Sequence, residues 1–237
     1  KTIAHAIPEA LGNKSLEMAY ECDQCNNLFG GTIEDSFGKW SKPMRTFARI
    51  RGKSGIPTLK KGSNGGWRIE YKESGLNVKD YQDDPIVTLD EENKKVTFSL
   101  KREPYIPANI AKALIKIGLS ILPEDEFQPF SCLCAWLREK DAQKNILKKF
   151  PILYTFTPGP MSNDRIVAMV LRRRASESGV PYAFFVLSYG NETYQVVLPF
   201  FEKDSTVIDK SITFPPFPML GNGNPEKYGQ PNDRQID

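Results

Sequence analysis

The chain has 237 residues, 26% of them charged and 40% hydrophobic, and its formal net charge is +3. This length supports one large domain or two small ones, and no apolar run approaches the roughly 18–20 residues that span a bilayer. The composition therefore argues against a membrane protein, and the small positive charge gives only weak support for a nucleic-acid partner.

The first forty residues contain a short strand followed by a loop. An apolar stretch at residues 2–6 predicts the strand, and Leu11-Gly12-Asn13-Lys14 predicts the loop. Because the chain does not begin with methionine, we expect this region to lack part of its natural N-terminal segment.

A helix is predicted next, from about Cys25. Apolar side chains recur there at spacings of three and four, which gives one apolar stripe: Phe29, Ile33, Phe37 and Trp40. The pair Gly30-Gly31 weakens this helix by roughly 1 kcal/mol per glycine, and Ser41-Lys42-Pro43 is predicted to end it. We therefore place a domain boundary between residues 43 and 44.

The remaining residues, 44–237, are predicted to form a larger mixed region. Strands are expected at 67–72, 86–89, 95–101, 152–156, 166–171, 182–188 and 194–199. Helices are expected at 107–121 and 132–147, and an irregular tail from residue 212. On the first of these helices, Lys112 and Lys116 lie opposite the apolar face and could meet phosphate. The order of elements predicts an α+β fold with a mostly antiparallel sheet.

The four cysteines form two close pairs, Cys22/Cys25 and Cys132/Cys134. So few cysteines in a chain of this length favour a reducing compartment, and we expect a cytoplasmic protein. Apolar neighbours of Cys132 and Cys134 predict buried thiols there. The pair Cys22/Cys25 has the spacing of half a zinc site or of a redox pair.

His5 is the only histidine of the chain. An imidazole can take a proton from water near neutral pH, because its unperturbed pKa is about 6.5. A phosphodiester also needs a divalent cation, which stabilises the leaving 3′ oxygen, and amide and carboxylate oxygens suit Mg²⁺. One histidine beside a hard-oxygen ligand is thus a minimal nuclease site.

The motifs around His5 resemble the HNH endonuclease superfamily. They are His5-Ala-Ile-Pro8, Leu11-Gly-Asn-Lys14 and Cys22-Asp-Gln-Cys-Asn-Asn27, in the order that one branch of the family has them. The resemblance covers roughly residues 3–37. It implies a small zinc-stabilised ββα-metal domain at residues 1–43, followed by an α+β accessory or target-recognition domain at residues 44–237.

The resemblance also implies roles for individual residues. His5 would be the general base, and Asn26 would help to bind the catalytic Mg²⁺ or Mn²⁺. Cys22 and Cys25 would bind a structural Zn²⁺. Two alternatives stay open for its other ligands: residues that precede Lys1, or Cys132 and Cys134. The residue that orients the histidine would be Asn13, although the family spacing points nearer Glu17.

One position departs from the family pattern. Many members have a carboxylate just before the histidine as a metal ligand, and this chain has Ala4. Glu34, Glu9 and Asp23 are the candidates to replace it, with Glu34 first because it lies within about 80° of Asn26 around the predicted helix.

The sequence thus predicts a metal-dependent endonuclease that cuts DNA, with phage defence or restriction implied by the resemblance alone. Residues 44–237 would choose the target or bind a partner protein. Two alternatives stay open: a catalytically inactive zinc-stabilised module that binds nucleic acid or serves as a scaffold, and a redox protein that uses Cys22 and Cys25.

Overall fold

A computed structural model describes residues 4–18, 20–61, 66–80, 85–139, 152–157, 163–174, 179–207 and 232–235. The predicted tail from residue 212 lies outside these ranges apart from 232–235, as do residues 140–147 of the second predicted helix. The described fold is α+β with antiparallel sheets, as the sequence predicts. No helix in these ranges is long and apolar enough to cross a membrane.

The first part of the chain is built from a 3₁₀ turn and two helices. These elements are η1 (Glu9–Leu11), α1 (Asp23–Gly31) and α2 (Ile33–Phe47). The single helix expected here is interrupted at Thr32, whose backbone angles of φ −126° and ψ −81° are not helical. The expected end at Pro43 is wrong, because α2 continues through Pro43 to Phe47. The boundary placed between residues 43 and 44 therefore falls inside a helix.

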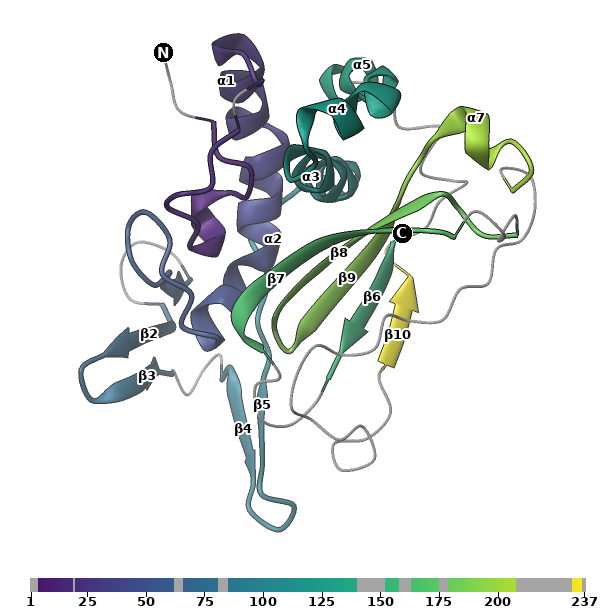
Figure 1. Ribbon diagram of the computed structural model, residues 1–237. Helices are drawn as coiled ribbons and strands as arrows, with labels where there is room; N and C mark the ends of the chain where they lie inside the picture. Colours follow the sequence, from purple (N-terminus) through teal and green to yellow (C-terminus); the bar gives the residue numbers. More distant parts are fainter. Residues whose placement is uncertain are drawn as a thin grey trace.

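The middle of the chain contributes two small sheets. Strands β1 (Leu59–Lys60), β2 (Arg68–Lys72) and β3 (Gly75–Lys79) form one, and β4 (Val87–Asp90) pairs with β5 (Lys95–Phe98) in the other. A satellite core of Leu59, Trp67, Ile69 and Ile86 lies beneath them and packs on Phe47 at the end of α2. Figure 1 shows the β4–β5 hairpin projecting from the rest of the molecule.

A run of helices precedes the main sheet. It comprises α3 (Pro107–Ser120), α4 (Glu124–Phe127), η2 (Gln128–Phe130) and α5 (Cys132–Arg138). One more short helix, α7 (Phe201–Asp204), comes later in the chain, after the sheet's central strands. Helix α5 is shorter than expected, since it ends at Arg138 and Glu139 is extended. The prediction for α3 is confirmed in position, but the helix is buried on every side from Ile110 to Ser120. A helix buried all round belongs to the interior of a fold.

The main sheet has five antiparallel strands in the order β10-β6-β9-β8-β7. Their bounds are β6 (Leu153–Phe156), β7 (Asn163–Arg172), β8 (Ala183–Gly190), β9 (Glu192–Leu198) and β10 (Asn232–Gln235). Helix α3 lies between α2 and the face formed by β7, β8 and β9 (Figure 1). Gly118 permits this close approach, because a Cβ there would lie 2.8 Å from Cγ of Phe185.

One hydrophobic core joins the two regions that the sequence separates. It combines Phe29, Phe37 and Trp40 of the first region with side chains of α3, α5, β8 and β9. The residues before position 44 therefore share their core with those after it, and α3 forms a common wall.

Candidate functional site

The segment around His5 forms a short antiparallel pairing that leads into helix α1. His5 is bridged to Glu17, and two backbone hydrogen bonds flank the bridge, from Ala6 N to Leu16 O (3.0 Å) and from Met18 N to Ala4 O (2.8 Å). The expected strand at 2–6 is thus represented by this bridge, with residues 1–3 outside the described ranges. Two paired segments followed by a helix are the local order of this site.

Asn13 holds the loop between the two paired segments. Its side-chain amide donates to the carbonyls of Ile7 and Leu16, each at 2.8 Å, and its Oδ1 accepts from the amides of Ser15 and Leu16. Gly12 before it has φ +87°, and a Cβ there would lie 3.3 Å from the Arg51 carbonyl oxygen. Residues with a Cβ rarely adopt this backbone conformation, so glycine is favoured at position 12.

The imidazole of His5 is close to one carboxylate. Its Nε2 lies 3.7 Å from Oε1 of Glu9, and its side chain is 20% exposed. The Nδ1 atom is buried and has no hydrogen-bond partner among the described residues. Glu9 also lies 3.6 Å from Nζ of Lys53. The orientation of the ring is therefore set by its backbone and by Glu9, and its buried nitrogen has no hydrogen bond to a described residue.

The other candidate carboxylates lie differently. The Glu34 Oε1 atom accepts a 2.7 Å hydrogen bond from the Lys116 ammonium, which makes it part of an ion pair. Asp23 is exposed in the first turn of α1. Ala4 is 4% exposed and packs inside. Of these candidates, Glu9 has its carboxylate within ion-pair distance of His5.

Cys22, Cys25 and Asn26 lie at the start of α1. Cys22 is the residue before the first turn, and its Sγ accepts a hydrogen bond from the Cys25 amide at 3.5 Å. This hydrogen bond from the Cys25 backbone amide lowers the pKa of the Cys22 thiol, whereas burial raises the pKa of the Cys25 thiol. The Asn26 amide nitrogen donates to the Cys22 carbonyl, and its side chain is half-buried.

The second cysteine pair is divided between surface and interior. Cys132 is exposed, which corrects the expectation of a buried thiol, and Cys134 is half-buried. Cys134 lines a cavity of about 190 Å³ together with Cys22, Cys25 and Glu21. Within the described ranges, however, no group of three or more His, Cys, Asp or Glu side chains could hold a metal ion. A zinc site complete within these residues is thus not formed.

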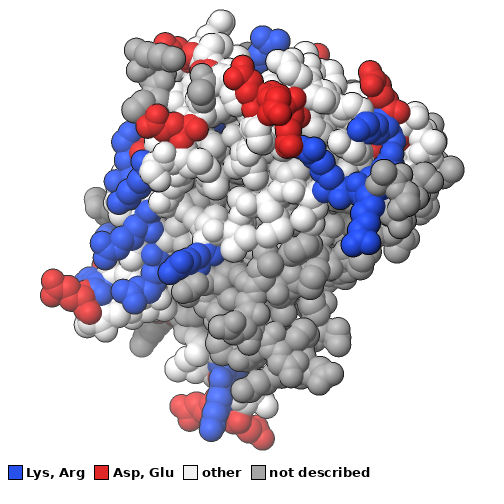
Figure 2. All heavy atoms as spheres, viewed as in Figure 1, with Lys and Arg blue, Asp and Glu red and all other residues white. Residues whose placement is uncertain are grey.

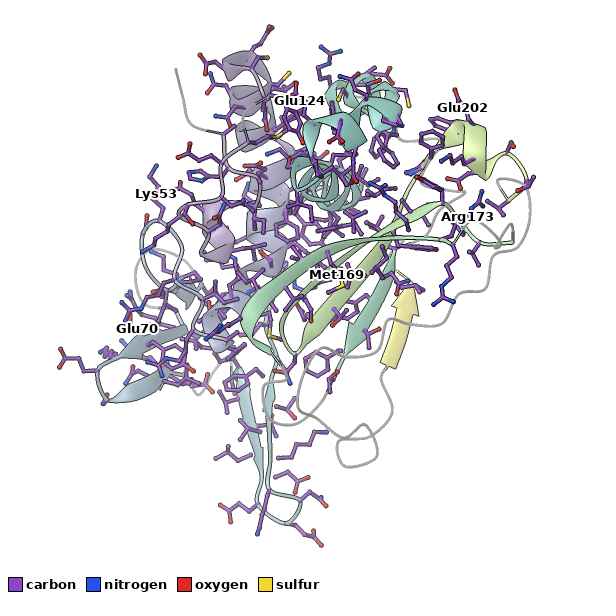
Figure 3. The ribbon with its side chains drawn as sticks, in the orientation of Figure 1. Lys53, Glu70, Glu124, Met169, Arg173 and Glu202 are labelled. Carbon is purple, nitrogen blue, oxygen red and sulfur yellow. The ribbon has the colours of Figure 1, made fainter. Side chains whose placement is uncertain are left out.

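Glu9, but not His5, lines a cleft of about 420 Å³. Its lining includes Glu9, Gly30, Glu34, Arg45 and Lys53. Three exposed cations follow α2 in the chain, Arg49, Arg51 and Lys53, and Lys53 lines the cleft. Figure 2 shows Lys and Arg gathered along one edge of the molecule, and Figure 3 shows Lys53 on the loop beside the first region. The cleft thus combines acidic groups with a cationic rim.

Two lysines expected on a wet helix face are buried instead. Lys112 and Lys116 of α3 are each 3% exposed, which contradicts the prediction that they could meet phosphate. Lys116 lies 3.1 Å from Oε2 of Glu21 as well as bonding to Glu34, and it reaches the His5 carbonyl at 3.4 Å. Sequence reasoning missed Glu21 and Lys116 as site residues. The available signal was a lysine enclosed by Ile115 and Ile117 on a helix with apolar residues all round.

A second buried acid lies in the main sheet, away from His5. Glu192 accepts hydrogen bonds from the hydroxyls of Tyr154, at 3.0 Å, and Tyr194. Burial raises the pKa of Glu192, while the tyrosine hydroxyls act in the opposite direction. Tyr154 on the neighbouring strand β6 and Tyr194 on the same strand β9 thus satisfy this carboxyl, which belongs to the sheet's interior.

Comparison of the chain with protein-family models, with curated proteins and with solved structures yields no match.

Proposed function

We propose that the chain is a metal-dependent endonuclease of HNH type that hydrolyses phosphodiester bonds of DNA. The observation that carries the proposal is the local order of the site. His5 lies in the first of two short paired segments, and the Asn13 side chain forms hydrogen bonds that hold the loop between them. The second segment leads to a helix that begins after Cys22 and contains Asn26. This order supports the ββα-metal fold that the sequence motifs imply.

In this mechanism His5 is the general base. Its side chain is 20% exposed, so the ring would accept a proton from a water molecule, and the hydroxide formed would attack the scissile phosphorus in line. Glu9, 3.7 Å from Nε2, limits the orientations of the ring and stabilises the imidazolium that forms. The histidine thus generates the nucleophile from water.

The carboxylate of Glu9, 3.7 Å from the His5 ring, is a donor that suits a hard divalent cation. Mg²⁺ or Mn²⁺ bound here would neutralise charge on the phosphate and stabilise the leaving 3′ oxygen. Glu9 and Asn26 would hold it, because Mg²⁺ takes one or two protein oxygens and completes its shell with water and phosphate. Glu34 is less suited than the sequence suggests, since its carboxylate already pairs with Lys116.

The cationic rim of the cleft fits a DNA backbone. Lys53 lines the cleft, and Arg49 and Arg51 are exposed on the segment before it. Lysine and arginine side chains that contact phosphates supply most sequence-independent affinity. We place DNA along this edge, with the remaining part of residues 44–237 choosing the target or binding a partner protein. The exposed cross-strand pair Leu89 and Val96, on the projecting β4–β5 hairpin, supports the latter role.

A structural Zn²⁺ at Cys22 and Cys25 remains part of the proposal. The hydrogen bond from the Cys25 amide to the Cys22 sulfur stabilises a thiolate of the kind that zinc requires. The other ligands are not among the described residues in a geometry that holds a metal.

A second candidate is an inactive module of the same fold that binds nucleic acid or serves as a scaffold. Two observations favour it: Ala4 is packed inside where the family has a metal ligand, and Glu34 is neutralised by Lys116. Such a module would bind DNA through the same cationic rim without cutting it.

Nicking of supercoiled plasmid DNA separates the two candidates. The purified chain and its His5→Ala and Leu16→Ala variants are incubated with Mg²⁺ or Mn²⁺ at low salt. Leu16→Ala is the control, because the Leu16 side chain lies on the same paired segment and is 48% exposed. The endonuclease proposal expects nicking by the wild type and the control, and at least a ~10²-fold loss in His5→Ala. Equal nicking by His5→Ala, or DNA binding without nicking by the wild type, would reject it.

A further inference from the structure

Lys116 connects three segments that lie far apart in the sequence. From the middle of α3, its ammonium reaches Oε1 of Glu34 at 2.7 Å, Oε2 of Glu21 at 3.1 Å and the backbone carbonyl of His5 at 3.4 Å. The contacts with Glu34 and the His5 carbonyl are hydrogen bonds, and the contact with Glu21 is an ion pair. Lys116 therefore joins the His5 backbone to both carboxylates.

The cluster is buried and its charges depend on one another. The side chains of Lys116 and Glu21 are each 3% exposed, and that of Glu34 is 22% exposed. Neither oxygen of Glu21 has a hydrogen-bond partner within the described ranges, so Lys116 is its compensating charge there. Burial and the Glu34 charge raise the pKa of Glu21, whereas Lys116 lowers it. Removing the ammonium would leave two carboxylates facing each other.

The backbone of His5 needs such an anchor. The pairing around it consists of a single bridge and two flanking hydrogen bonds, and so short a pairing is only marginally stable alone. The ring itself has no close hydrogen bond, because Glu9 lies at 3.7 Å and Nδ1 has no partner among the described residues. The direction of the imidazole therefore follows from where its backbone is held.

We propose that Lys116 is a positioning residue for His5, which fixes the histidine backbone against α3 and the Glu21–Glu34 pair. This inference rests on the proposed function for its catalytic meaning, although the anchoring can be measured without cleavage. A displacement of about 1 Å of a catalytic group can reduce a rate by ~10²-fold.

Lys112 provides a matched control. It lies one turn earlier on α3 and is equally buried, at 3% exposure. Its ammonium donates to the Glu139 carbonyl and lies 5.2 Å from the centre of the Trp136 ring. Loss of Lys112 therefore removes a buried charge from the same helix without touching the His5 segment.

The experiment compares Lys116→Met with Lys112→Met in the full chain. Plasmid nicking with Mg²⁺ gives kcat and KM, and the ring C–H signals of the single histidine are followed by NMR. We expect Lys116→Met to lower kcat by ~10–100-fold with little change in KM, and to shift the His5 signals. Lys112→Met is expected to leave both readouts near the wild type. Unshifted His5 signals in Lys116→Met would overturn the proposal.

A double variant separates positioning from charge balance. If Lys116→Met does not fold, Lys116→Met/Glu21→Gln removes the uncompensated buried charge as well and carries the test. We expect this variant to fold, to retain displaced His5 signals and to cut as poorly. Recovery of wild-type signals and cutting would show that Lys116 serves only to balance charge, and would overturn the proposal. A wild type that cuts no DNA rejects the proposed function, while the His5 signals still decide on the anchor.

Discussion

Replacing Gly118 with alanine measures how closely α3 is held against the main sheet. The added Cβ would lie 2.8 Å from Cγ and 2.9 Å from Cβ of Phe185, which is fully buried in β8. Overpacking of this kind costs about 1–3 kcal/mol, and alanine returns about 1 kcal/mol as the better helix former. We therefore expect the free energy of unfolding to fall by up to about 2 kcal/mol.

Gly38→Ala in α2 is the control for this substitution. A Cβ at Gly38 meets no atom within 4 Å, so the variant should gain up to about 1 kcal/mol from helix propensity alone. Urea unfolding of both variants, with unchanged m values, gives the comparison. If Gly118→Ala is as stable as Gly38→Ala, then α3 does not pack on β8 as described, and the argument for a shared core fails.

Three further substitutions or modifications test other parts of the structure. Asn13→Ala should lower the free energy of unfolding by about 2 kcal/mol, because four hydrogen bonds of the loop depend on the Asn13 side-chain amide. Asn13→Asp retains the acceptor oxygen and should lose less stability. Equal losses for the two variants in urea unfolding would contradict this. Burial raises the pKa of Glu192, so wild-type stability should fall as pH rises through that pKa, by at most about 1.4 kcal/mol per pH unit. Glu192→Gln should remove this fall, and parallel pH profiles would refute the assignment. The hydrogen bonds that Cys22 accepts at the start of α1 lower the pKa of its thiol. In chelator-treated protein, iodoacetamide should therefore modify Cys22 at lower pH than the exposed Cys132, as peptide mass spectrometry would reveal. Modification of Cys132 at lower pH than Cys22 would count against these hydrogen bonds.

Most elements of the fold could be predicted from periodicity, and the errors have physical causes. The alternation of side chains gave β2 and β4 to within a residue, and the helix at 107–121 matches α3. Pro43 was predicted to end a helix because proline removes a backbone donor. Helix α2 nevertheless continues, since Trp40 before it and Phe47 after it both pack against cores, and packing outweighs local preference.

The candidate site could be predicted only where its residues are close in sequence. His5, Asn13 and Cys22 fall within one short segment, so their order and spacing are visible in the chain. Lys116 is separated from His5 by 111 positions, and its contact depends on how α3 packs in the core. No local pattern distinguishes a lysine that bonds to a distant carbonyl from one on a solvated face. For the same reason the preference for Glu34 as a metal ligand could not anticipate its pairing with Lys116.

The continuity of α2 across residue 43 has a consequence for protein engineering. A fragment that stops at residue 43 would cut α2 after Lys42-Pro43 and lose the α3 residues that cover Phe37 and Trp40. It would also leave Glu21 and Glu34 without their lysine. The His5 segment therefore cannot be transferred to another protein by itself, and any transplant of it must carry α3 as well.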